Sequence, residues 1–295
     1  METQFKWIGI QLEPPEPKDQ KKKKSLKGKP VLSALVLALI VCGCLFCQLL
    51  MTKDPSYMDL AQHTHPPNRT YLFGTDTMGR DIFSMIWYGG RLSLLIGTLS
   101  TLCSTLLAVV YGTVSGLAGP RLDRMLMRLL EILLSVPNLL IIVLLQAVFG
   151  SPNAFSISLV IGITSWMSIA KIVRTEVRQL RGSEYILASR TMGGGFWHIL
   201  WNHLLPNFVS SIMFMVVMNI RSAIVAESTL SFMGVGLPIE VVSWGSMLSL
   251  AEQAMMTGAW WVILIPGAFL VVTLLCITNL GHYLRWRLNR QESQI

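Results

Sequence analysis

Charged residues are scarce in this chain of 295 residues. Asp, Glu, Lys and Arg together make up 14% of it, against about 25% in an ordinary soluble domain. Cysteine is sparse as well, and five residues do not indicate a disulfide framework. By contrast, 52% of the residues are hydrophobic and the mean hydropathy is +0.55. This composition excludes a disordered chain, and the length of the apolar runs excludes a soluble enzyme. We therefore expect an all-α, polytopic membrane protein.

The motifs of several common enzyme classes are also missing. The sequence has no G-x-x-x-x-G-K-[ST] phosphate loop, no H-E-x-x-H zinc motif and no G-x-S-x-G nucleophile elbow. We predict a non-catalytic subunit without a catalytic residue, a cofactor site or a metal site. The net charge of +8 does not indicate a nucleic-acid partner, because the lysines and arginines lie at the ends of the apolar segments.

Six apolar stretches are long enough to cross a bilayer, which takes roughly 20 helical residues. Pro137 and Pro266 lie inside two of them and are expected to introduce kinks. The sequence predicts six transmembrane helices, at Val31–Met51, Leu92–Ala118, Met125–Phe149, Ala154–Val173, Phe208–Met233 and Trp261–Tyr283.

The distribution of positive charge predicts the orientation of these helices. With six crossings, the lysine-rich start of the chain, the connections that contain Arg121 and Arg178, and the end of the chain fall on one side. That side is expected to be the cytoplasm, so both termini are predicted to be cytoplasmic. The predicted organisation is a basic tail at 1–30, a first span at 31–51, an extracytoplasmic loop at 52–90, a core domain at 91–283 and a cytoplasmic tail at 284–295.

Three segments carry recognisable motifs. The first is the outer-loop motif L-F-G-T-D-T-M-G-R-D at 72–81, which continues into Y-G and R-x-S-L at 88–94. The second is E-Y-I-L-A-S-R-T-M-G at 184–193, which leads to L-P-N at 205–207. The third is L-S-F-M-G-V-G at 230–236, followed by W-G-S-M-L at 244–248.

Together these segments resemble the dipeptide/oligopeptide/nickel family of ABC-transporter permeases, and specifically the C-type subunit of a type I importer. The resemblance covers about residues 31–285. It implies a type I importer permease fold in a bacterial cytoplasmic membrane, in contact with membrane lipid. It also implies three kinds of protein partner: a sister permease that completes a heterodimer, two cytoplasmic ATP-binding subunits, and an extracytoplasmic substrate-binding protein.

The second segment lies in a polar connection at 174–206 that also carries apolar side chains and a glycine triplet. The resemblance implies that it is the coupling helix, which docks on an ATPase. Ala188 and Gly193 match the small positions of the family's E-A-A-x-x-x-G core, whereas Leu187 stands in place of its glutamate. The alternative is an amphipathic loop at the membrane surface without a partner. The expected coupling residues are Glu184, Leu187, Ala188, Arg190, Gly193 and Pro206.

The outer-loop motif contributes the candidate residues Gly74, Thr75, Asp76, Gly79, Arg80 and Asp81. Its carboxylates can accept hydrogen bonds from loop backbone, and Arg80 can bind a carboxylate. Two interpretations remain open. Either the motif braces the loop against the second span, or the loop contacts the binding protein or the incoming substrate. His63 and His65 are spaced for a transition-metal site, but no third ligand is near, so a solvated loop is favoured.

Two ionisable residues, Arg221 and Glu227, fall in or near the fifth span. Such groups are expensive in a membrane and usually face a cavity or a partner, so we expect a pore-lining or subunit-interface role. Their spacing places them on different faces of a helix. The cargo remains open between di- or oligopeptides and nickel or a nickel chelate. A stand-alone channel or membrane enzyme is a further alternative, but the sequence shows neither a filter nor an in-membrane catalytic cluster.

Overall fold

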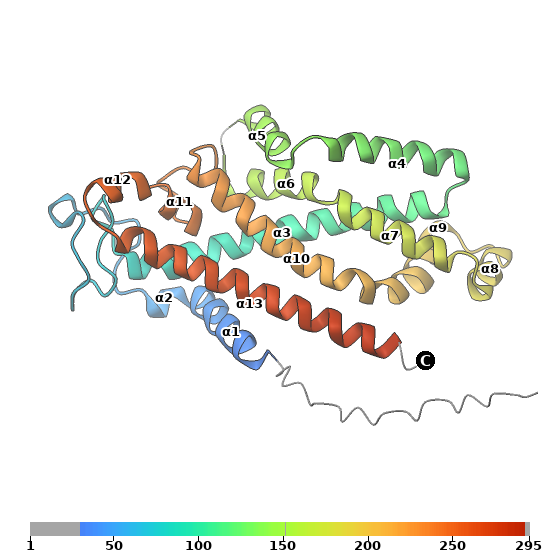
Figure 1. The fold of residues 1–295 in the computed structure, drawn as a ribbon, viewed down its shortest axis with the longest axis horizontal. Helices are drawn as coiled ribbons and strands as arrows, with labels where there is room; N and C mark the ends of the chain where they lie inside the picture. The colour runs from blue at the N-terminus through green and yellow to red at the C-terminus, as the bar shows by residue number, and fades with distance from the viewer. Residues whose placement is uncertain (1–29, 151, 293–295) are drawn as a thin grey trace, which may run out of the picture.

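The computed structural model describes residues 30–150 and 152–292, which fold as a bundle of helices (Figure 1). The basic tail predicted at 1–30 therefore lies almost wholly outside the described residues, as does the last part of the C-terminal tail. Within the described residues, β-structure is limited to one isolated bridge between Thr75 and Asp81. The α-helices are α1 Val31–Leu45, α2 Cys47–Leu50, α3 Ile82–Leu117, α4 Pro120–Ser135, α5 Asn138–Phe149, α6 Ala154–Ser165, α7 Met167–Leu180, α8 Glu184–Thr191, α9 Phe196–Ile199, α10 Leu205–Phe232, α11 Trp244–Leu248, α12 Ala251–Met256 and α13 Trp261–Glu292.

The described helices include fewer uninterrupted spans than the six predicted. Three are long and apolar enough to cross a membrane, namely Ile82–Leu117, Phe196–Phe232 and Trp261–Arg287. Two further spans are possible if each bent pair, α4 with α5 and α6 with α7, counts as one crossing. The first predicted span, Val31–Met51, is divided at Phe46 into α1 and α2, and α1 has only 15 residues. The all-helical membrane architecture is confirmed, but the number of six is not.

The predicted start of the second span at Leu92 is wrong, because α3 begins already at Ile82. Asp81 caps the helix: its side chain accepts a hydrogen bond from the backbone N–H of Ser84 at 3.1 Å. Such a cap satisfies an N–H group that the first helical turn leaves free. Residues 82–90 of the loop predicted at 52–90 are therefore helical.

The third predicted span is broken where Pro137 stands. Val136 is extended, with φ −86° and ψ 131°, as expected for a residue that precedes proline. The axes of α4 and α5 differ by 88° across this break, far more than the kink that the sequence suggested. The fourth predicted span is also bent, by 45° at Trp166, and α7 continues past the predicted end at Val173 to Leu180.

Two further prolines, one in the sixth predicted span and one in the predicted coupling connection, do not end helices. Pro266 lies inside α13, which runs to Glu292, beyond the predicted end at Tyr283. Pro206 lies in the first turn of α10, where proline is tolerated because the first N–H groups of a helix have no partner inside it. The preceding five residues, Leu200–Leu204, form a π-helical segment (η2) that joins α9 to α10.

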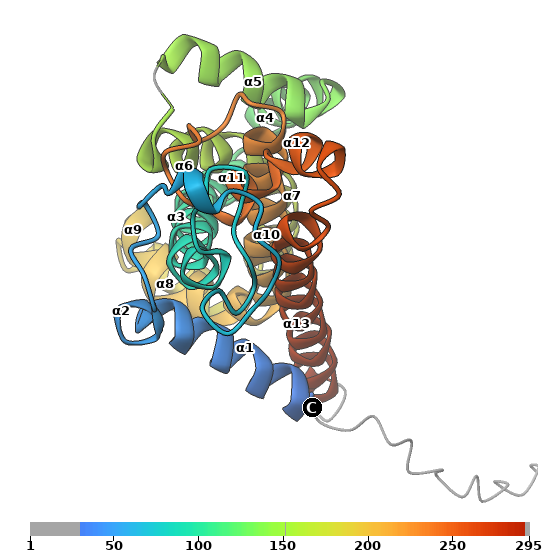
Figure 2. The same cartoon turned by 90° about the vertical axis from the view of Figure 1, so that its left-hand side faces the viewer.

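Helix α3 is the centre of the bundle and packs against α1, α6, α7 and α10 (Figure 2). The α3–α7 contact is close, because a Cβ atom at Gly112 would lie 2.7 Å from the carbonyl oxygen of Ala170. Glycine therefore lets the two backbones approach one another. One apolar core lies at the end near the 52–81 loop and includes Cys44, Ile86, Trp244 and Trp261. A second lies towards the other end and includes Leu130, Val173, Ile199 and Phe208.

Candidate functional site

The outer-loop motif is buried and lies against the start of α3. All six of its predicted residues are buried. Arg80 donates from Nε to Asp76 Oδ2 at 2.7 Å, and the two side chains are 1% and 2% exposed. Arg80 also donates from a terminal nitrogen to the carbonyl oxygen of Ile239 at 3.1 Å. The buried ion pair therefore joins the loop to the α10–α11 connection.

The other polar residues of the motif make bonds within the same part of the bundle. Thr52 Oγ1 donates to Asp81 Oδ2 at 3.0 Å, which holds the start of the loop to the cap of α3. The backbone N–H of His65 donates to Thr75 Oγ1 at 2.7 Å, and Trp261 Nε1 donates to the carbonyl oxygen of Thr75 at 3.1 Å. These contacts tie the loop to α3 and α13. The six candidate residues are therefore engaged inside the bundle, whereas Leu72 of the same motif is exposed.

The two histidines of the loop make local contacts. His63 Nδ1 lies 3.0 Å from the carbonyl oxygen of Leu60, and His65 Nδ1 lies 3.2 Å from that of Pro66. In the described part of the chain, no group of three or more His, Cys, Asp or Glu side chains is placed to hold a metal ion.

Glu227 is fully buried and lies in a cage of serine hydroxyls. Ser243 and Ser231 donate to its Oε1 atom at 2.8 and 3.1 Å, and Ser93 and Ser228 donate to its Oε2 atom at 3.3 and 3.4 Å. These serines come from α3, from α10 and from the N-cap of α11. The carboxylate thus connects three elements at the end of the bundle near the outer loop.

Arg221 has a different environment from Glu227, although both lie on α10. Its side chain is exposed on the surface of the described chain. The two residues do not contact each other, because six positions place them on different faces of the helix. The structure thus brings Glu227, but not Arg221, into contact with other polar side chains.

The predicted coupling segment forms a short helix, α8, at the opposite end of the bundle from the outer loop (Figure 1). Ile186 is fully buried and anchors α8 in the second apolar core. The side chains of Tyr185 and Leu187 are 42% and 48% exposed, and that of Met192, directly after the helix, is 87% exposed. A helix that is fixed on one side and exposes apolar side chains on the other resembles a docking surface.

The glycine triplet reverses the chain after α8. Gly193 has a φ angle of +83°, which L-residues other than glycine rarely adopt. The backbone N–H groups of Gly193 and Gly194 donate to the carbonyl oxygens of Arg190 and Ser189, at 3.0 and 2.8 Å. These bonds close the C-terminus of the helix. Among the other predicted coupling residues, Glu184, Ala188 and Arg190 are exposed on α8, whereas Pro206 lies apart from it in α10.

A buried carboxylate, Asp123, was missed in the sequence analysis. It accepts hydrogen bonds from Arg174 at 2.6 Å, from Arg178 at 2.8 Å and from the hydroxyl of Ser115 at 2.7 Å. This ion cluster joins α4 to α7 and α3, just before the chain enters α8. Only one indication of this site is present in the sequence. Asp123 follows Pro120 by three positions and so falls in the first turn of an arginine-rich helix.

Comparison with known proteins identifies the class. Residues 108–290 match the family of binding-protein-dependent transport system inner membrane components, and the chain belongs to this family. It is thus a transport permease subunit, a multi-pass inner-membrane protein and a non-catalytic component, which confirms the resemblance found in its motifs.

Several curated relatives cover most of the chain. It is 37% identical over 222 residues to the dipeptide transport system permease protein DppC of Bacillus subtilis, which covers 75% of this chain and 69% of that protein. It is 35% identical over 255 residues to the oligopeptide transport system permease protein OppC of the same organism, covering 86% and 83%. It is 31% identical over 262 residues to the probable D,D-dipeptide transport system permease protein DdpC of Escherichia coli, covering 88% and 87%.

The buried ion pair of the outer loop leads to a prediction about stability. Replacing Arg80 with Ala leaves the Asp76 carboxylate buried without its counter-ion, which should lower the free energy of unfolding by about 3–5 kcal/mol. The matched control is Arg69→Ala in the same loop, where the side chain is exposed, and a change within about 0.5 kcal/mol is expected. Unfolding of both variants is measured in the same detergent. Equal stability of the two variants would contradict a bracing role for the motif.

Proposed function

We propose that this chain is one of two permease subunits of an ATP-driven importer that moves di- and oligopeptides across the cytoplasmic membrane. The similarity to dipeptide and oligopeptide transport permeases supports this cargo. The single observation that carries the importer proposal is α8, a helix anchored by Ile186 whose outer side presents Tyr185 and Leu187. Such a helix is suited to receive a partner and to pass on its movement as a rigid body.

The partner at α8 is proposed to be a cytoplasmic ATPase. The hollow beside α8 has a volume of about 590 Å³ and is lined by Tyr185, Met192, the glycine triplet and two histidines of the following segment. Its mixture of apolar and polar groups is typical of the central part of a protein interface. The sister permease and a second ATPase complete the proposed complex, and a substrate-binding protein meets the opposite end.

The proposed orientation places α8 and both termini in the cytoplasm. Figure 1 shows α8, α9 and the end of α13 at one end of the bundle, and the 52–81 loop with α11 and α12 at the other. Arg174, Arg178, Arg181 and Arg190 gather near the first end. The positive-inside rule therefore supports a cytoplasmic position for this end.

Transport in proteoliposomes tests the cargo. The complete complex, reconstituted with its binding protein, should accumulate a labelled dipeptide only when ATP is supplied on the ATPase side. Omission of the ATPases should abolish accumulation, because this chain supplies no nucleotide site of its own. Accumulation of radioactive nickel without any peptide would favour the nickel alternative. Uptake through this chain alone would refute the importer and favour a channel.

The role of α8 predicts the effect of a single substitution at its end. A Cβ atom at Gly193 would meet no atom within 4 Å, so Gly193→Val introduces backbone strain without a clash. That strain is roughly 1–2 kcal/mol and is local, so membrane insertion should be preserved while the docking surface is displaced. We expect ATP hydrolysis to become uncoupled from uptake, or the ATPases to dissociate. Both activities and ATPase retention on a sizing column are measured on the same preparation.

Gly182→Val is the control for this prediction. Gly182 precedes α8, has open space around its Cβ position and does not adopt a positive φ angle. This variant should keep normal uptake. If Gly193→Val behaves like Gly182→Val in uptake, hydrolysis and ATPase retention, α8 is not the coupling element.

A further inference from the structure

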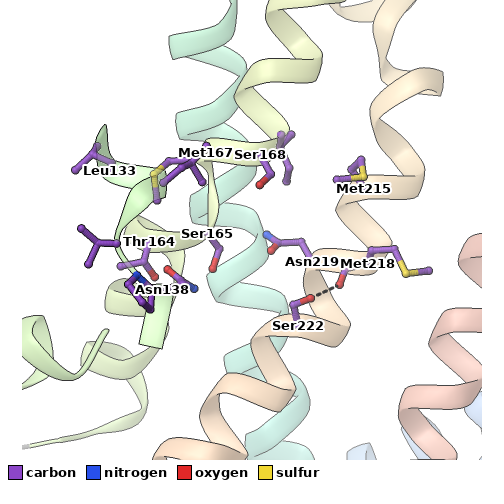
Figure 3. A pocket seen from close by; sticks show the side chains of 14 residues that line it. Leu133, Asn138, Thr164, Ser165, Met167, Ser168, Met215, Met218, Asn219 and Ser222 are labelled. Carbon is purple, nitrogen blue, oxygen red and sulfur yellow. Dashed lines mark hydrogen bonds between the residues drawn. The ribbon is translucent and has the colours of Figure 1, made fainter. Parts of the chain in front are cut away.

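A cavity of about 390 Å³ lies where the two broken spans meet α10 (Figure 3). Its walls include Pro137 and Asn138 at the α4–α5 break, Ser165 and Met167 at the α6–α7 break, and Met215 and Asn219 on α10. Residues 215–222 fall in the middle of the 28-residue helix α10. The cavity is therefore about halfway along a helix that is long enough to cross the membrane.

The two helix breaks, between α4 and α5 and between α6 and α7, lie beside the same cavity. A helix in a bilayer keeps its backbone groups satisfied, and a break exposes them unless protein or a water-filled cavity surrounds it. Two helices that are broken beside the same cavity are the arrangement by which several kinds of transporter form a substrate site. Here the breaks bend the chain by 88° and 45°, and both border this one cavity.

Polar side chains without partners converge on the cavity. Within the described residues, the side chains of Asn138, Ser165 and Ser168 make no hydrogen bond; Asn138 and Ser168 are exposed, and Ser165 is half-buried. Asn219 donates from Nδ2 to the hydroxyl of Ser104 at 2.5 Å, which fixes its side chain and leaves its Oδ1 atom without a donor. Figure 3 shows Ser165 and Ser168 on one side of the space and Asn219 on the other.

Other polar side chains in the wall of the cavity have partners in their own helices. Ser222 also lines the cavity, but its hydroxyl donates to the carbonyl oxygen of Met218 in its own helix at 3.1 Å. Thr164 is bonded to its own helix in the same way. Asn219 is buried, so its Oδ1 atom is costly at membrane depth unless water or a polar ligand donates to it. Asn138, Ser165 and Ser168 are at least partly exposed and are free to bond to the same ligand.

The chemistry of the walls defines the ligand class. None of the fourteen described residues that line the cavity carries a charge, and three of them, Met167, Met215 and Met218, are methionines. Hydroxyl and amide groups match the N–H and C=O groups of a peptide backbone. Methionine adapts its shape to different apolar side chains and is common at surfaces that accept many ligands. The volume lies within the range of about 300–1,000 Å³ that is usual for small-molecule sites.

We infer that this cavity holds the backbone of the transported peptide on its way through the membrane. The Asn219 Oδ1 atom accepts from a peptide N–H, the hydroxyls of Ser165 and Ser168 donate to a peptide carbonyl, and the methionines contact the peptide side chains. The site recognises the amide backbone and tolerates varied side chains. This inference rests on the proposed function, because it takes the cargo to be a peptide.

Site-specific photocrosslinking tests the inference in the complete complex. A benzophenone amino acid replaces Met215, which lines the cavity, and in a matched variant it replaces Met213, which is exposed and does not line it. The two positions lie about 200° apart around α10. During ATP-driven uptake of a labelled dipeptide, we expect about tenfold more label on the variant at position 215, because only that side chain reaches the cavity.

The outcomes separate the two proposals. If the parent complex imports the peptide but both positions are labelled equally, or position 215 is not labelled, the cavity is not the peptide site. If the parent complex imports no peptide, the proposed cargo is wrong, and the peptide is excluded as the occupant.

A second pair of variants avoids the bulky photoprobe. Ser168→Leu loses no hydrogen bond of the described chain, so it should assemble normally while it narrows the cavity and removes a hydroxyl. We expect peptide uptake to fall by about tenfold with unchanged retention of the ATPases, since a lining group lost from a small site typically costs that much. Thr175→Leu, at an exposed position on the same helix outside the cavity, should keep the uptake of the parent. Equal uptake by the two variants would overturn the inference.

Discussion

The lack of water inside a bilayer is the constraint on which this structure depends, because a polar group at that depth is costly unless the protein or a water-filled cavity satisfies it. The clearest example is Glu227, an acidic residue on a long apolar helix. Hydroxyls from Ser93, Ser228, Ser231 and Ser243 surround its carboxylate and connect three elements. The same requirement explains the third motif of the sequence. Ser231 of this motif is one of the donors of the cage, and Gly245 lies so close that a Cβ atom there would be 3.0 Å from Glu227 Oε1.

The other end of the bundle satisfies its charges by a different arrangement. Asp123 is bonded to Arg174, Arg178 and Ser115, so α3, α4 and α7 are joined immediately before α8. Helix α4 ends at the cavity and α7 begins there. Both helices therefore lie between the proposed docking helix and the proposed peptide site. A displacement of α8 can therefore reach the cavity through elements that are held together by an ion cluster. Unpartnered buried hydroxyls also occur on α3, but in the wall of the cavity several unpartnered polar side chains lie together around one space.

Much of the architecture could be predicted from the sequence, because apolar runs of spanning length indicate helices whatever their neighbours. The runs that became α3, α10 and α13 are of this kind, and Pro137 marks the break between α4 and α5 by its own chemistry. The bend of 45° at Trp166 has no proline beside it, so no local pattern in the sequence predicts it. In the Asp123 cluster, the carboxylate is separated along the chain by 51 positions from Arg174 and by 55 positions from Arg178. The walls of the cavity come from three separate segments. Neither can be predicted from the spacing of residues along the chain.

The central claim is that the serine cage around Glu227 is sealed inside the bundle, whereas Ser168 faces a water-filled path. Thiol labelling measures this difference directly. In the assembled complex, Ser168→Cys should react with a small water-soluble thiol reagent, after correction for the native cysteines. Ser228→Cys, in the buried cage around Glu227, should remain unreactive until the protein is unfolded. Equal reactivity at the two positions, or protection of position 168 in every state of the transport cycle, would contradict the account.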